Sequence, residues 1–178
     1  MMARVAIEFT PAVTQGGGVA RSVYGMTAAL LEAASHDYTL FVAGKAALPL
    51  EITRHNPQIK RAPLSATSLT RLWHRIHLPL PVEAFVGRTD LYFATDFALA
   101  PHMKRTKTAV FIHDLTFARV PDAAVPSLVG YLSGVVPRSI RNSDVVVVNS
   151  ESTKADIIAL YGTPEDHIIP VQFGVDSR

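Results

Sequence analysis

The chain has 178 residues, of which 48% are hydrophobic and 18% are charged, and its formal net charge is +2. This length and composition suit one ordinary globular domain and exclude an intrinsically disordered chain, which would combine few apolar residues with a high net charge. The mild charge, with no basic stripe, argues against nucleic-acid binding, and the absence of cysteine excludes disulfides, thiolate metal sites and cysteine nucleophiles.

Predicted strands and helices alternate along the first half of the chain. Val19, Val23 and Met26 recur at helical spacing, and a later helix must end before Pro79 because proline cannot continue a helix. The predicted elements, in chain order, are a strand at 4–9, a loop rich in turn residues at 10–18, a helix at 19–34, strands at 38–43 and 59–64, and a helix at 68–78.

The second half continues the same alternation. Two prolines interrupt the helical pattern at 122–142, so we expect two pieces or a kink there. Ser150 or Ser152 can cap the next helix, which Gly162 stops. The remaining elements are strands at 91–95, 108–113, 145–149 and 167–173.

This alternation predicts an α/β fold, a Rossmann-like parallel sheet of about seven strands with helices on both faces, in which residues 1–178 form a single domain. Apolar runs at 110–112 and 145–148 indicate strands that are buried on both sides. No run approaches the ~18 apolar residues of a spanning helix, and the N-terminus leads straight into a strand without a secretory signal. We therefore expect a cytoplasmic protein.

Ligands of open parallel sheets bind outside the carboxyl ends of the strands, and these loops should lie along one edge. Gly16, Gly17 and Gly18 follow the first strand and precede a helix. Close backbone approach and the helix N-terminus favour a phosphate there, although a mobile surface loop is the alternative. A dinucleotide fingerprint fits poorly because Arg21 stands in place of its third glycine.

His113 and Asp114 leave the carboxyl end of the strand at 108–113, and Asp96 leaves that of the strand at 91–95. The imidazole can donate a hydrogen bond to a sugar hydroxyl or a phosphate oxygen. Asp114 could orient that ring or accept a hydrogen bond from a sugar hydroxyl. A purely structural histidine is the alternative interpretation.

The stretch at 71–77 offers two further possibilities. His74 and His77 could share a helix face, but no third ligand accompanies them, so we predict no metal site. The basic and apolar residues at 71–76 could rest on anionic lipid, or the helix could pack on its own domain. The sequence also lacks a hydrolase nucleophile elbow and a close carboxylate pair suited to glycoside hydrolysis.

The order of these pieces resembles the family-four retaining glycosyltransferases of the GT-B architecture, and the likeness spans the chain. Two positions depart from the family pattern: Phe173 replaces the usual Asn, and Asn142-Ser143 replaces Arg-Ala. The resemblance is carried by four segments, namely 16–21 (GGGVAR), 111–117 (FIHDLTF), 142–157 (NSDVVVVNSESTKADI) and 169–176 (IPVQFGVD).

The resemblance implies the N-terminal, acceptor-side half of an enzyme that transfers a sugar from a nucleotide sugar to a glycan or lipid-linked acceptor. The C-terminal nucleotide-sugar-binding domain would be absent, so this chain alone is expected to be inactive. No cofactor or metal is expected besides the nucleotide sugar. The implied roles are donor diphosphate binding for Gly16, Gly17 and Gly18, catalytic contacts for His113 and Asp114, and acceptor contacts for Arg21 and Asp96.

Two other functions stay open. A half-transferase fold could serve as a non-catalytic module that binds a glycan or protein, or the chain could be another Rossmann-type nucleotide-binding enzyme. The stretch at 113–117 resembles bacterial polysaccharide mannosyltransferases more than other subgroups. The isolated domain could also form a dimer through apolar surface, or associate peripherally with the inner face of a membrane.

Overall fold

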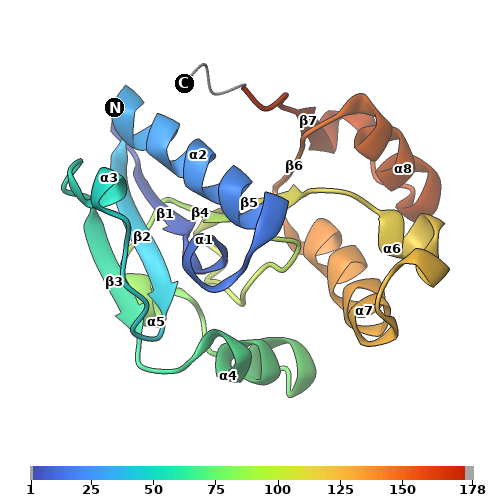
Figure 1. Cartoon of the computed structure of the whole chain (residues 1–178), viewed down its shortest axis with the longest axis horizontal. Coiled ribbons are helices and arrows are strands. Elements are labelled where there is room, and N and C mark those ends of the chain that lie inside the picture. Colours follow the sequence, from blue (N-terminus) through green and yellow to red (C-terminus); the bar gives the residue numbers. More distant parts are fainter. Residues whose placement is uncertain (1, 175–178) are drawn as a thin grey trace. The chain divides into compact units, whose positions relative to one another are not determined.

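The computed structural model describes residues 2–174 and divides the chain into two compact units. The first unit comprises residues 1–95 and 100–108, and the second comprises residues 96–99 and 109–178 (Figure 1). Residues 175 and 176 of the terminal motif lie outside the described part of the chain.

The fold is α/β and Rossmann-like, as predicted, and every strand pairing that the structure describes is parallel. The strand order β3-β2-β1-β4-β5-β6-β7 gives a seven-stranded sheet, which confirms the predicted number of strands. The strands are β1 (Arg4–Glu8), β2 (Asp37–Ala43), β3 (Gln58–Ala62), β4 (Leu91–Ala94), β5 (Lys107–Ile112), β6 (Val145–Val148) and β7 (Ile168–Pro170).

Helices cover both faces of the strands in the first unit. Figure 1 shows α2 (Gly17–Ala33) running alongside β1 and β2. Its buried Val23 and Leu31 belong to one apolar cluster with Ile7 and Leu40, together with Ile52 of α3 (Leu50–Thr53). This cluster forms the core between α2 and the strands.

Aromatic side chains form the packing on the other face of the first unit. The ring of Phe41 in β2 lies 5.7 Å from that of Phe85 in α5 (Glu83–Val86). It also lies 6.2 Å from the ring of Trp73, whose Nε1 donates to the carbonyl of Leu80 at 2.9 Å. Consecutive strand residues point to opposite faces, so Phe41 and Leu40 lie on different sides.

The second unit packs two longer helices with its strands. The buried side chains of α7 (Pro126–Asn142) include Leu132, Val136 and Ile140, and α8 (Glu151–Tyr161) buries Ile157. A short helix, α6 (Thr116–Arg119), is tied to α8 because Arg119 Nε donates to Asp156 Oδ1 at 2.8 Å.

The prediction of a loop at 10–18 is wrong. Residues Thr10–Thr14 form a helix, α1, which Pro11 can begin because the first turn needs no proline N–H. The Thr10 hydroxyl accepts from the backbone N of Ala43 at 2.9 Å and holds this helix to β2. Gly17 and Gly18 then open α2 rather than standing in a loop.

The helix predicted at 68–78 is also only partly right. It begins earlier, as α4 (Ala66–Thr70), and continues as a π-helical turn at Arg71–Arg75. The predicted interruption of 122–142 is confirmed only before Pro126, where a 3₁₀ turn at Pro121–Ala123 precedes α7; the helix α7 runs unbroken through Pro137.

Candidate functional site

The N-terminus of α2 is open at the three glycines. Its N-cap, Gly16, supplies no side-chain hydrogen bond, and the first turn carries no acidic residue. Gly17 has a φ of +74°, which glycine adopts without strain, and a Cβ placed on any of the three glycines would meet nothing within 4 Å. The first-turn N–H groups therefore have no side-chain cap, and an anion is the partner that suits them.

Arg21 lies one turn further along α2 and is exposed. Its guanidinium adds a positive charge to the same end of the helix. The glycines and Arg21, predicted separately as diphosphate and acceptor contacts, are thus brought together in the first unit.

Sequence reasoning missed two polar groups, Glu8 at the carboxyl end of β1 and Tyr92 within β4. The Glu8 carboxylate accepts from the Thr10 backbone N at 3.0 Å and from the Tyr92 hydroxyl at 3.1 Å. Burial, followed by the negative charge of Glu8, raises the pKa of Tyr92 well above its usual value, so the phenol remains a donor. The signal for Glu8 was its place near the carboxyl end of the first predicted strand.

His113 follows β5 in the second unit and is 7% exposed. Its ring centroid lies 4.6 Å from that of Phe111 and 5.4 Å from that of Phe97. Phe97 has a φ of +53°, an uncommon value for a side chain of this size, and its backbone N donates to the Phe111 carbonyl at 3.0 Å. Because Asp96 directly precedes Phe97, the structure brings the segments of Asp96 and His113 together.

Asp114 has a local structural contact. Its Oδ1 accepts from the backbone N of Thr116 at 2.9 Å, a side-chain turn that starts α6. The residue is exposed, so a ligand can approach it from solvent. His113 and Asp114 are therefore held by a short turn between β5 and α6.

The start of α8 is a structural cap, as predicted for Ser150. Its Oγ accepts from the backbone N of Thr153 at 3.1 Å, and Glu151 stands in the first turn. The helix ends at Gly162 with a φ of +63°, the left-handed end that the glycine predicts.

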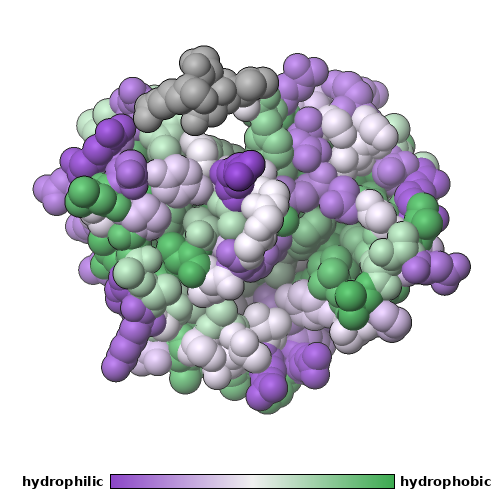
Figure 2. All heavy atoms as spheres, viewed as in Figure 1, coloured by the Kyte–Doolittle hydropathy of each residue, from purple (hydrophilic) through white to green (hydrophobic). Residues whose placement is uncertain are grey.

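Residues 2–174 contain neither a cluster of metal-ligating side chains nor a membrane-spanning helix. No group of three or more His, Cys, Asp or Glu side chains there could hold a metal ion. Within the same residues, none of the helices has the length and apolar character needed to cross a membrane. On the face shown in Figure 2, hydrophobic and hydrophilic residues are interspersed.

A parallel α/β sheet with polar groups after the carboxyl ends of its strands defines a Rossmann-like ligand-binding class. A family model described as Glycosyltransferase Family 4 matches residues 16–178, which include the three glycines, Asp96, His113 and Asp114. The chain belongs to this glycosyltransferase family. No curated protein matches it.

Proposed function

We propose that this chain is the acceptor-side domain of a retaining glycosyltransferase of the GT-B architecture. It transfers a sugar from a nucleotide sugar to a glycan or lipid-linked acceptor, together with a second domain that binds the nucleotide. The observation that carries the proposal is the family match over residues 16–178. The protein acts in the cytoplasm and uses no metal cofactor.

The first unit contributes the donor diphosphate contact. The first turn of α2 supports this role because its N–H groups have no side-chain cap and no acid competes for them. Such a helix end stabilises negative charge, and charge on the departing diphosphate is what a transferase must stabilise. Arg21 contacts the acceptor from the same helix.

The second unit contributes the contacts to the transferred sugar. His113 donates to a hydroxyl of that sugar, and the rings of Phe97 and Phe111 beside it restrict the orientation of its imidazole. Asp114, which follows His113, and Asp96, which precedes Phe97, accept from sugar or acceptor hydroxyls. Mannose is the donor sugar that the resemblance at 113–117 favours.

A lipid-linked acceptor brings the enzyme to the inner face of a membrane. Ile76 is 68% and Leu78 is 41% exposed, directly after the exposed cations Arg71 and Arg75. Exposed apolar side chains beside cations suit the surface of an anionic bilayer. Without the second domain, exposed apolar surface of this kind also supports a dimer of the isolated chain.

The test is to supply a nucleotide-sugar-binding domain of the same family and assay transfer from a panel of nucleotide sugars, GDP-mannose included. We expect His113→Ala to lower the transfer rate by about 10²-fold, the usual cost of losing one preorganised donor. His167→Ala, a change of the same kind in the second unit, is the control. Absence of transfer from every donor by the folded protein would contradict the proposal, and glycan binding without transfer would indicate a non-catalytic module.

A further inference from the structure

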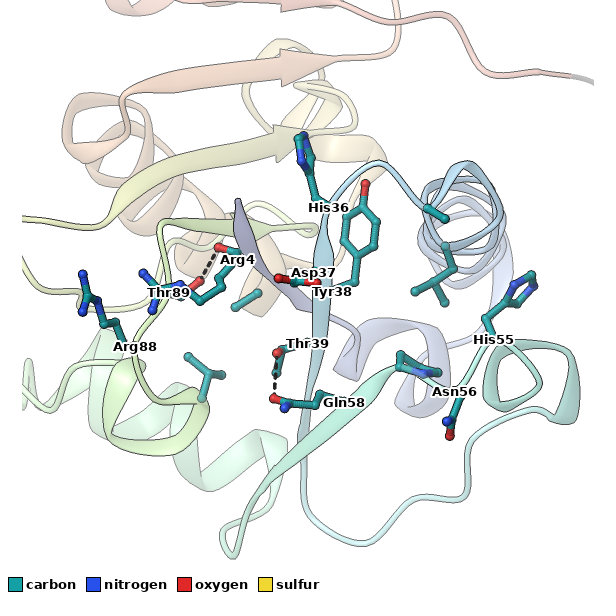
Figure 3. A pocket seen from close by; sticks show the side chains of 15 residues that line it. Arg4, His36, Asp37, Tyr38, Thr39, His55, Asn56, Gln58, Arg88 and Thr89 are labelled. Carbon is teal, nitrogen blue, oxygen red and sulfur yellow. Dashed lines mark hydrogen bonds between the residues drawn. The ribbon is translucent and has the colours of Figure 1, made fainter. Parts of the chain in front are cut away.

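The first unit contains a pocket of about 550 Å³ at the edge where its strands begin, away from the carboxyl ends. We call it the amino-edge pocket. Its volume lies within the range of about 300–1,000 Å³ that is usual for ligand sites. Figure 3 shows Arg4, Arg88 and Thr89 on one side of the first residues of β2, and His55 and Asn56 on the other.

The amino-edge pocket continues around the end of the strands from one face to the other. Leu31 and Tyr38 line it and belong to the core beneath α2. Val86 also lines it and lies in α5, whose Phe85 packs on Phe41 at the opposite face. A ligand that fills the whole of this pocket is therefore extended rather than compact.

The charges around the pocket nearly cancel. Arg4 is paired with Asp90, since its Nε donates to Asp90 Oδ2 at 3.0 Å, and this hydrogen bond lowers the pKa of Asp90 to about 2. Arg88 and Asp37 then remain as one cation and one anion, with His36 and His55 counted as neutral. A dianionic ligand would meet Asp37 and a cationic ligand would meet Arg88, so an uncharged ligand fits best.

The other polar groups of the pocket suit hydroxyls. The Thr39 hydroxyl donates to Gln58 Oε1 at 3.4 Å, which leaves the amide NH₂ of Gln58 as a donor. Asn56 is exposed at a φ of +53° and adds a second amide. Amides both donate and accept, as sugar hydroxyls do, and the rings of Tyr38 and His36 stand edge to face with centroids 6.2 Å apart.

We propose that the amino-edge pocket binds a neutral oligosaccharide chain. The proposal goes beyond the transfer reaction, because the lining of this pocket carries it and no donor sugar is involved. In a glycosyltransferase, such a site would hold a glycan away from the carboxyl ends of the strands.

The test is a titration of the folded protein, followed by amide NMR, with neutral tetrasaccharides of mannose, glucose and galactose. Mannose alone and inorganic phosphate are the comparison ligands. We expect at least one tetrasaccharide to shift the amide signals of residues 36–39, 55, 56 and 58, with a much weaker response to the monosaccharide. No shift with any tetrasaccharide, or a stronger response to phosphate, would overturn the proposal.

Two substitutions locate the binding. Asn56→Gly keeps the left-handed backbone and removes one amide, and Gln58→Ala removes the other; each should weaken binding about fivefold, the effect of losing roughly one hydrogen bond. His77→Gly is the matched control, because His77 also has a positive φ, +59°, and does not line the pocket. Equal affinity in all three variants would contradict the site.

This experiment is independent of the transfer assay. Binding requires neither a nucleotide sugar nor a second domain. Failure of transfer with intact oligosaccharide binding would therefore count against the proposed enzyme and leave the amino-edge pocket supported. Sugar transfer without oligosaccharide binding at residues 36–39 and 55–58 would support the proposed enzyme and count against the amino-edge pocket.

Discussion

The helices α2 and α8 each begin shortly after a strand, one in each unit, yet their first turns are completed differently. In α8, Ser150 accepts a backbone hydrogen bond and Glu151 adds a negative charge. In α2, Gly16 offers no side chain, and the first turn has no acid. A side-chain cap at the N-terminus of a helix stabilises the fold. At a helix N-terminus without such a cap, the first N–H groups can bind a ligand instead.

Among substitutions at the two helix starts, Gly17→Ala should have the largest effect on stability and on pyrophosphate binding. Gly17 has a φ of +74°, and a side chain in that conformation costs about 1–2 kcal/mol. We expect the free energy of unfolding in urea to fall by that amount and pyrophosphate binding to weaken as the turn shifts. Gly25→Ala in the middle of the same helix is the control and should raise stability by up to about 1 kcal/mol. Equal behaviour of the two variants would show that the left-handed turn does not matter.

Removing the side-chain cap of α8 should have the next largest effect, on the free energy of unfolding alone. Ser150→Ala deletes the acceptor for the Thr153 backbone N and should lower the free energy of unfolding by about 1 kcal/mol. Pyrophosphate affinity should not change, since this cap serves only stability. Ser133→Ala, at an exposed position within α7, is the control and should change stability little. A measurable loss of pyrophosphate binding in Ser150→Ala would break the distinction between the two helices.

An acidic residue in the first turn of α2, as in α8, should raise stability and weaken pyrophosphate binding. Gly18→Glu and Gly18→Gln should both raise the free energy of unfolding, by up to about 1 kcal/mol, because either residue favours a helix more than glycine does. Only the glutamate should weaken pyrophosphate binding, about fivefold, through a like-charge interaction of about 1 kcal/mol. The urea midpoint and the pyrophosphate titration measure the two effects. Similar affinities for both variants would mean that the anion does not bind at this turn.

A smaller effect concerns the charge balance at the opposite edge of the first unit. The hydrogen bond from Arg4 lowers the pKa of Asp90 to about 2, so the carboxylate stabilises the fold above its unfolded pKa of about 3.9. That stabilisation is lost as the pH falls through the folded pKa. The difference in urea midpoint between the parent protein and Asp90→Asn should therefore be full at neutral pH and shrink below about pH 4. A difference that stayed constant from neutral pH down to about pH 2 would contradict the stabilising pair of Asp90 and Arg4.

Hydrophobic periodicity and helix signals were sufficient to predict most of the fold. The strands at 4–9 and 145–149 and both ends of α8 could be located, because local sequence determines caps and buried strands. Helix α1 was missed because its residues, TPAVT, have the composition of a loop, and its position depends on the hydrogen bond from Ala43 to Thr10. The π-helical turn at Arg71–Arg75 accompanies the burial of Trp73, a tertiary contact without a sequence signal.

Of the candidate site, the sequence predicted only those residues that come after the carboxyl end of a strand. Gly16 and His113 were found because each follows the carboxyl end of a strand. Glu8 was missed because its contact with the hydroxyl of Tyr92, a residue distant in sequence, arises only in the folded chain. The amino-edge pocket was missed entirely, since its lining comes from several segments and forms no motif.

In the proposed enzyme, the first turn of α2 receives the donor diphosphate. The most direct test of this contact is amide NMR of the folded chain during a titration with millimolar inorganic pyrophosphate. Diphosphate binding at this turn predicts saturable shifts of the amide signals of Gly17, Gly18 and Val19, with those of Ser150–Thr153 unchanged at the capped start of α8. Unchanged glycine signals at saturating pyrophosphate, or equal shifts at both helix ends, would contradict it.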